Sequence, residues 1–329
     1  MKILVVKPTA LGDVAQALRV APLLKQAPGC RELVWLVDEE YAPVLELCPS
    51  IDRLILFPRR KWRKNWLRAE TAAWFGQLRR ERFDIVLDLQ GLARSALMTL
   101  AAGAPRRIGL RSSRELALLA YTEMADDHSI HAVDRYREAA RILAGTEQQP
   151  NQPALRVPCG DLPRGLSAGK FTVIHPYSQW STKLWGWQNY ETLIQLLPQE
   201  TFVLVGQGPF FPVLAPNVVD LRNKTSLAVL LGLLGQARAV VSTDSGPLHL
   251  ADAFETPVVA VYGASDPRKT GPKGRASRIL TASVPCRPCL SRKCEYDERM
   301  ACMRGVKPEQ VAEAWMEVAK MRENSQHAG

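Results

Sequence analysis

The amino-acid sequence predicts an α/β protein with two domains, each built on a parallel sheet. Short apolar runs alternate with amphipathic, helix-like segments along most of the 329 residues. Strands that are apolar on both faces and separated by helices are typical of parallel sheets covered on both sides. The alternation occurs twice, and a stretch rich in Pro, Gly and Gln, residues 145–169, separates the two series. A chain of this length is sufficient for two domains of ordinary size.

Each series contains apolar runs short enough to be strands. In the first series the runs are KILVVK, ELVWLV, RLILF and DIVLDL, which begin at residues 2, 32, 53 and 84. Helical segments are predicted between them, over residues 13–26, 65–81 and 91–103. In the second series the runs are KFTVIH, TFVLVG, NVVDL, AVVST and PVVAVYG, which begin at residues 170, 201, 217, 239 and 257. We therefore expect domains at 1–155 and 170–307, followed by a C-terminal helix and tail at 308–329.

Composition restricts the class of protein. Apolar residues make up 47% of the chain and charged residues 23%, which is typical of a soluble globular protein. The longest apolar candidate, Leu227–Leu234, is far shorter than the ~20 residues of a membrane-spanning helix. The amino terminus enters a strand without a secretory signal, so we expect a cytoplasmic protein. A net charge of +10 indicates an acidic partner: a phosphorylated substrate, an anionic lipid or nucleic acid.

One turn in the second series has the features of an anion site. The apolar run that ends at Thr243 is followed by Asp244, Ser245 and Gly246, and a helix is predicted to begin near Pro247. Free N–H groups at that helix start, with the Ser245 hydroxyl, suit an anion. The alternative is an ordinary helix cap, because Asp and Ser are common there.

A second polar loop follows the first predicted strand of the same domain. It carries Ser178, Ser181, Thr182 and Lys183 ahead of a helical segment. Hydroxyls with one lysine suit a diphosphate, the lysine acting as a point charge. Two such loops in one domain predict a phosphate site.

Several motifs together carry a family resemblance. They are VKPTALGDV near the start, LDLQGLARSAL at 87–97, HAVDRYREA at 131–139, STKLWGW at 181–187 and STDSGPLHLADAFETPVVAVYGASDP at 242–267. With these motifs the chain resembles the ADP-heptose:lipopolysaccharide heptosyltransferases of glycosyltransferase family 9, with spacing most similar to the heptosyltransferase I group. The resemblance implies a GT-B fold, in which two Rossmann-like domains with parallel sheets face each other across a cleft. It also implies an inverting transfer of L-glycero-D-manno-heptose from ADP-heptose to a Kdo residue of the lipid A inner core.

The resemblance assigns the catalytic residues. Asp13, after the first strand, matches the family's general base, which accepts the proton of the attacking acceptor hydroxyl. Lys183 matches the lysine that neutralises the departing diphosphate. The alternative for Asp13 is a simple cap of the helix at 14–26.

The donor site is expected in the second domain. Its candidate residues are Ser178, Thr182, Lys183, Gln207, Asp244, Ser245, Gly246 and His249. Relatives have an acidic residue near position 207 that contacts the adenosine ribose, and here Gln207 is the candidate for that contact. For His249, a packed structural role is the alternative to a functional one.

The acceptor site is expected in the first domain. Residues 58–80 combine cations with Trp62, Trp66 and Trp74, which suits Kdo carboxylates, lipid A phosphates and an anionic membrane surface. Arg60, Arg63 and Lys64 match the family's acceptor-binding basic cluster, and Arg135 is a further candidate in the same domain. The alternative is a solvated helix face whose tryptophans pack inward. Nucleic acid is not expected, because no known binding module is recognisable.

Four cysteines form a C-x2-C-x4-C-x7-C pattern. Cys286, Cys289, Cys294 and Cys302 predict a structural zinc or iron site, with buried thiols as the alternative. The resemblance implies that catalysis itself requires no metal or other cofactor.

The sequence thus predicts a cytoplasmic glycosyltransferase that associates peripherally with the inner face of the inner membrane. One alternative is a family 9 relative with another acceptor, such as a later core heptose or a protein. Another is a nucleotide-sugar-binding protein without catalysis, although the presence of Asp13, Lys183 and Asp244 together favours an enzyme.

Overall fold

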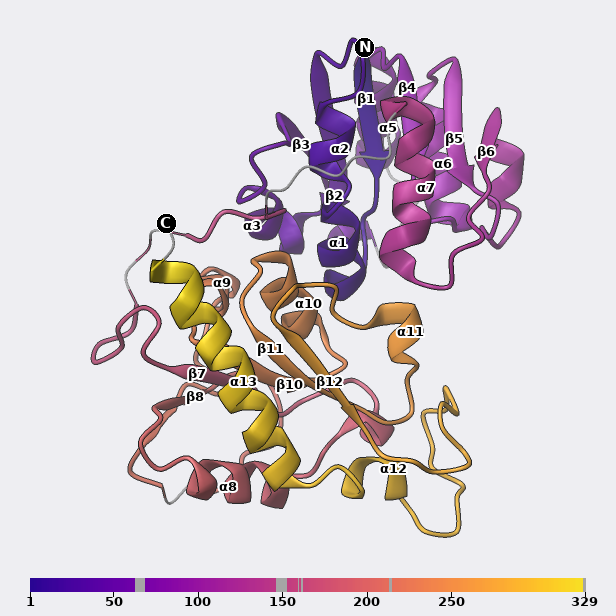
Figure 1. Ribbon diagram of the computed structural model, residues 1–329. Coiled ribbons are helices and arrows are strands. Elements are labelled where there is room, and N and C mark those ends of the chain that lie inside the picture. The colour runs from indigo at the N-terminus through magenta and orange to yellow at the C-terminus, as the bar shows by residue number, and fades with distance from the viewer. Residues whose placement is uncertain (63–68, 146–152, 159, 161, 213–214, 328–329) are drawn as a thin grey trace. The chain divides into compact units, whose positions relative to one another are not determined.

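The computed structural model divides into two compact units, Met1–Arg156 and Val157–Gly329. It describes residues 1–62, 69–145, 153–158, 160, 162–212 and 215–327, with the side chains of 323–327 left aside. Each unit contains one six-stranded sheet in which all pairs of neighbouring strands are parallel (Figure 1). The predicted repetition of the sheet pattern is therefore confirmed.

The first sheet has the strand order β3-β2-β1-β4-β5-β6. Its strands are β1 (Lys2–Val6), β2 (Glu32–Asp38), β3 (Arg53–Phe57), β4 (Ile85–Asp88), β5 (Arg106–Leu110) and β6 (Glu123–Ala125). Because β1 and β4 are central and buried on both faces, they consist almost entirely of Ile, Leu and Val. Their carboxyl ends meet at one edge, where Lys7 and Leu89 follow the strands.

Helices cover both faces of the first sheet. They are α1 (Leu11–Leu18), α2 (Ala21–Lys25), α3 (Ala42–Leu45), α4 (Arg59–Trp62), α5 (Ala69–Arg80), α6 (Ala93–Ala102) and α7 (Ala132–Ala144). Figure 1 shows α1, α2 and α7 in front of the sheet and α5 and α6 behind it. The helix predicted over 13–26 is two helices, because the chain turns between Arg19 and Val20. Residues 63–68, which include the first four residues of the helix predicted over 65–81, lie outside the described residues.

The second sheet has the strand order β12-β11-β10-β7-β8-β9. Its strands are β7 (Thr172–His175), β8 (Phe202–Leu204), β9 (Val218–Asp220), β10 (Ala239–Thr243), β11 (Val258–Tyr262) and β12 (Ser277–Thr281). Strand β10 lies between β7 and β11, so the loops that follow β7 and β10 are neighbours although they are far apart in sequence. A ligand bound at this edge of the sheet would contact both loops.

The second unit contains two pairs of helices whose members pack against each other. The full set is α8 (Trp187–Leu196), α9 (Leu227–Gln236), α10 (Gly246–Ala253), α11 (Pro267–Thr270), α12 (Ala301–Arg304) and α13 (Pro308–His327). Helix α13, yellow in Figure 1, packs on α8 and on the central strands, and its Trp315 indole donates to Thr172 Oγ1 at 2.8 Å. Helices α9 and α10 pack against each other. The C-terminal helix is thus an integral part of the second unit's core.

Helix hydropathy also bears on the membrane question. In the part of the chain that the structure describes, none of the helices is long and apolar enough to span a bilayer.

Candidate active site

The turn after β10 places a carboxylate and a helix start together. Strand β10 ends at Thr243, Asp244 follows, and Ser245 occupies the N-cap position of α10. Within the described chain the Ser245 side chain makes no capping hydrogen bond, so it does not compete for the helix N–H groups. Pro247 fits the first turn because it lacks an N–H that would need a partner. This helix start can bind an anion.

Asp244 is the centre of an ion-pair network. Its Oδ2 accepts from Lys183 Nζ at 2.6 Å, and its Oδ1 lies 3.2 Å from His249 Nε2. The Tyr262 hydroxyl lies 3.4 Å from the same Oδ1. Burial alone would raise the pKa of Asp244, but His249 and Lys183 outweigh it and hold the pKa well below its usual range. Asp244 is therefore an anion that fixes Lys183 at the carboxyl end of the sheet.

The loop after β7 brings further predicted residues to the same edge. Ser178 Oγ donates to the main-chain carbonyl of Asp244 at 3.4 Å, and Lys183 Nζ stands 4.5 Å from the centre of the Trp180 ring. The structure therefore gathers Ser178, Lys183, Asp244, Ser245, Gly246 and His249 where β7 and β10 end. Lysine, hydroxyls and helix N–H groups in one place suit a diphosphate.

Thr182 differs from its predicted role in one respect. It is buried, and its hydroxyl donates to the main-chain carbonyl of Ser291 at 2.7 Å. Ser181 Oγ donates to the carbonyl of Arg292 at 3.4 Å. The loop that carries Lys183 is thus fastened to the cysteine-rich segment by two hydroxyl–carbonyl hydrogen bonds.

Gln207 lies in the loop after β8, the neighbour of β7. Its side chain is exposed, and Gly206 before it has φ +111°, a conformation that favours glycine. Tyr177 fastens this loop by donating its hydroxyl to Pro209 O at 2.8 Å. Gln207 is accessible at the strand end, one strand away from Lys183.

Asp13 lies at the corresponding edge of the first unit. It is exposed in the first turn of α1, and its Oδ2 accepts from the Ala10 N–H at 3.3 Å. Lys7 is buried near this loop and donates to Leu89 O at 3.1 Å. Burial alone would lower the pKa of Lys7, but Tyr136 and Asp13 outweigh it and raise the pKa. The capping contact of Asp13 is present, and its carboxylate is also open to solvent.

The predicted acceptor residues are distributed along the same sheet. Arg60 follows β3 at one edge, is 80% exposed and pairs with Glu40. Arg135, on α7, donates to Ser112 Oγ at 3.3 Å near the end of β5, on the opposite side of β1. Arg63 and Lys64 lie outside the described residues. Arg60 and Arg135 therefore lie on opposite sides of β1, the strand that precedes Asp13, and do not form one cluster.

The described tryptophans of this region pack against aromatic rings of the first unit. Trp62 is only 3% exposed and packs edge-on against Phe57, with ring centres 5.4 Å apart. Trp74 packs against Trp62 at 5.3 Å and donates its indole N–H to Leu56 O. The alternative of tryptophans that pack inward therefore holds for Trp62, which is part of the unit's core, and Trp74 is half-buried against the same cluster. Trp66 lies outside the described residues.

The predicted metal site is not supported by the geometry. Over the described residues, which include Cys286, Cys289, Cys294 and Cys302, no group of three or more His, Cys, Asp or Glu side chains is arranged to hold a metal ion. These four cysteines are free thiols. Burial first, and then the three neighbouring thiols, raise the pKa of Cys302. Of the four thiols, that of Cys302 is buried, those of Cys286 and Cys294 are half-buried, and that of Cys289 is exposed.

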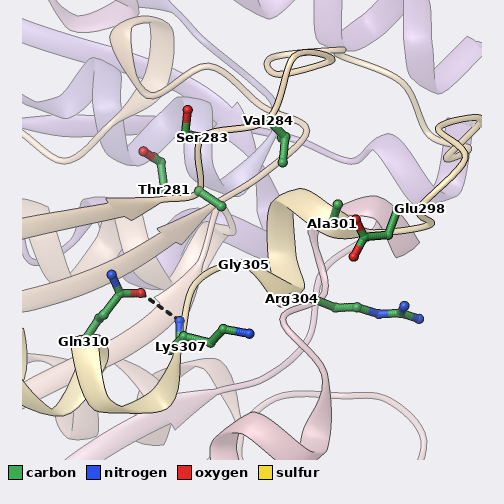
Figure 2. Close-up of a pocket in the computed structure, with 10 residues that line it drawn as sticks. Thr281, Ser283, Val284, Glu298, Ala301, Arg304, Gly305, Lys307 and Gln310 are labelled. Atoms are coloured by element: carbon green, nitrogen blue, oxygen red, sulfur yellow. Dashed lines mark hydrogen bonds between the residues drawn. The ribbon is translucent and has the colours of Figure 1, made fainter.

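A pocket lies beside this segment, between the end of β12 and the start of α13 (Figure 2). Its volume is about 380 Å³, and its lining includes Thr281, Ser283, Glu298, Arg304 and Lys307. None of the predicted donor residues lines it. The lining side chains of these five residues are exposed, so the pocket is a surface depression separate from the β7 and β10 loops.

Comparison with known proteins decides the family. The family model described as glycosyltransferase family 9 (heptosyltransferase) matches residues 71–299. The chain belongs to this family. It is a glycosyltransferase, and the predicted family and enzyme class are confirmed.

Individual relatives of this heptosyltransferase family cover nearly the whole chain. The chain is 28% identical to lipopolysaccharide heptosyltransferase 1 of Pseudomonas aeruginosa, covering 95% of this chain and 96% of that protein. It is 30% identical to the enzyme of the same name from Escherichia coli K12, covering 86% and 94%. The solved structure of E. coli heptosyltransferase WaaC with ADP matches with a TM-score of 0.77 at 25% identity, over 97% of this chain and all of that one. The predicted GT-B fold class is thereby confirmed.

Sequence reasoning missed part of the second unit's network. His175, Ser242 and Tyr262 line the same strand ends but were not predicted. The sequence did contain a signal for two of these residues. His175 ends the apolar run KFTVIH and Ser242 lies near the end of AVVST, so each is a polar residue at the carboxyl end of a predicted buried strand.

Proposed function

We propose that this family 9 enzyme transfers L-glycero-D-manno-heptose from ADP-heptose to a Kdo residue of the lipid A inner core, with inversion. The observation that carries the proposal is the Lys183–Asp244 pair beside the free helix start at Ser245. The relatives named lipopolysaccharide heptosyltransferase 1 support the choice of donor and acceptor. An E. coli relative was solved with ADP-2-deoxy-2-fluoro heptose, which supports a heptose nucleotide as donor.

In the proposed reaction the donor lies at the carboxyl ends of β7 and β10. Ser178, Ser245 and the N–H groups of α10 hold the diphosphate, with Gln207 toward the nucleoside. Lys183 can contact both Asp244 and the diphosphate because an ammonium has three protons. As the bond between the anomeric carbon and the diphosphate oxygen breaks, charge grows on the diphosphate and Lys183 stabilises it.

The acceptor is proposed to bind the first unit. Its hydroxyl attacks the anomeric carbon, the new carbon–oxygen bond forms, and Asp13 takes the proton. Arg60 and Arg135, with Arg63 and Lys64, are proposed to bind the carboxylates and phosphates of the acceptor. The net charge of +10 supports a peripheral position on the anionic inner face of the inner membrane, which places the enzyme in the cytoplasm. The proposed steps use side chains and main-chain N–H groups of this chain and need no cofactor.

The test is mass spectrometry of the product formed from ADP-heptose and Kdo2-lipid A. We expect one added heptose with wild-type protein. Asp13→Asn should lower the rate on the order of 10²–10⁴-fold and leave the affinity for ADP-heptose nearly unchanged. Glu46→Gln, which changes an exposed carboxylate of the same unit, is the matched control.

Other outcomes separate the alternatives. A heptose added only to a longer core oligosaccharide or to a protein would show a different acceptor. Binding of ADP-heptose without any product would indicate a nucleotide-sugar-binding protein. Normal turnover of Asp13→Asn would remove Asp13 as the base.

A further inference from the structure

The hydroxyl of Ser245 is connected to a buried histidine. His175, the last residue of β7, places Nδ1 3.2 Å from Ser245 Oγ and 3.5 Å from Ser242 Oγ. The two serine oxygens lie 3.0 Å apart. His175 and Ser242 are buried, whereas Ser245 is partly exposed. The chain of contacts therefore runs from the interior of the sheet to the helix start.

Counting protons shows which way these hydrogen bonds point. Ser242 Oγ lies 3.2 Å from His175 O and 3.1 Å from Thr243 O, and carbonyl oxygens can only accept. The single hydroxyl proton of Ser242 therefore goes to a carbonyl. Toward Ser245, the Ser242 oxygen can then only accept.

Two arrangements remain for the imidazole. If Nδ1 accepted from Ser245, the contact between the two serine oxygens at 3.0 Å would contain no proton. If Nδ1–H donates to Ser245, the Ser245 proton can serve the contact with Ser242, so both contacts of Ser245 Oγ have one donor and one acceptor in the protein without ligand. The Ser245 proton is then left to point either to Ser242 or to a ligand.

We infer that His175, with its proton on Nδ1, donates to Ser245 Oγ and so keeps the Ser245 hydroxyl as a hydrogen-bond donor to the diphosphate of the donor nucleotide. The inference rests on the proposed donor site. His175 is a positioning residue, because it acts on the ligand only through Ser245.

The surroundings of the ring are consistent with this role. Burial lowers the pKa of His175 to about 4, so the imidazole is neutral at physiological pH. A neutral imidazole carries one proton, either on Nδ1 or on Nε2, and the other nitrogen can only accept. The ring is also packed against Gly206: a Cβ on that glycine would lie 2.7 Å from Cδ2 and 2.8 Å from Nε2. Gly206 thus closes the Cδ2 and Nε2 side of the ring, the side away from Nδ1.

The direct test is nitrogen NMR of full-length protein labelled with ¹⁵N-histidine. We expect the His175 signals to show a proton on Nδ1, both without ligand and with ADP. A proton on Nε2 alone would overturn the inference. This measurement needs no variant and is independent of any loss of folding.

A double-mutant cycle on ADP binding tests the route through Ser245. His175→Leu removes the donor and should weaken ADP binding about tenfold, whereas His175→Asn retains an N–H near the Nδ1 position and should recover most of it. In the Ser245→Ala background, His175→Leu should have little further effect. His128→Leu, at an exposed histidine, is the control.

The outcomes distinguish this inference from the proposed function. Equal losses from His175→Leu with and without Ser245→Ala would show a general structural role and refute the inference. If Lys183→Ala still weakens ADP binding in that case, the donor site stands. If neither Lys183→Ala nor Ser245→Ala changes ADP affinity, the donor site itself is misplaced.

Discussion

Acidification should destabilise the protein through His175. Burial lowers the pKa of this histidine from 6.5 to about 4. Between these values the unfolded chain binds a proton that the folded chain does not, so stability rises with pH and falls on acidification. One pKa unit corresponds to about 1.4 kcal/mol, so going from about pH 7.5 to about pH 5 should cost about 2 kcal/mol of unfolding free energy.

Urea-induced unfolding, followed by tryptophan fluorescence at several pH values, measures this loss. In His175→Asn the titrating group is absent, and the pH dependence over this window should be shallower than in wild type by about 2 kcal/mol. His128→Asn, at an exposed histidine, is the matched control. Parallel curves for wild type and His175→Asn would refute the assignment of a buried neutral imidazole.

Three further predictions concern other parts of the chain. Lys183→Ala should weaken ADP binding roughly 10–100-fold by calorimetry, whereas Lys269→Ala, at an exposed lysine, should not. Iodoacetamide should modify Cys294 before Cys48, as read by peptide mass spectrometry. The Met300 N–H lowers the pKa of the Cys294 thiol, whereas burial raises the pKa of Cys48 to about 11. Trp62→Ala should lower the unfolding free energy by about 3–5 kcal/mol in urea titrations; a change below about 1 kcal/mol would contradict its core role.

Much of the fold can be predicted from the sequence because each strand is marked by a pattern of apolar residues within a few neighbouring positions. The runs at β1, β4, β7 and β10 are apolar on both faces, and only strands covered by helices on both sides tolerate that. The turn at Asp244 is also local, since strand end, carboxylate and helix start lie within a few residues.

The rest depends on which strands are neighbours. His175 meets Ser242 only because β7 pairs with β10, and the sequence separates these residues by 67 positions. Sequence likewise cannot say which face of a basic, aromatic segment is turned inward, so it left both surface contact and inward packing open for Trp62, which packs against Phe57.

The hydrogen bonds from Ser181 and Thr182 to the cysteine-rich segment have a consequence for how this protein can vary. Both hydrogen bonds are accepted by main-chain carbonyls, those of Arg292 and Ser291. They therefore depend on the main-chain path of that segment and not on its side chains. Substitutions that keep the path leave the Lys183 loop supported, whichever residues stand there. Insertions or deletions would shift the carbonyls and loosen a loop more than a hundred residues away in sequence. Among related chains, length in this segment should therefore vary less freely than composition.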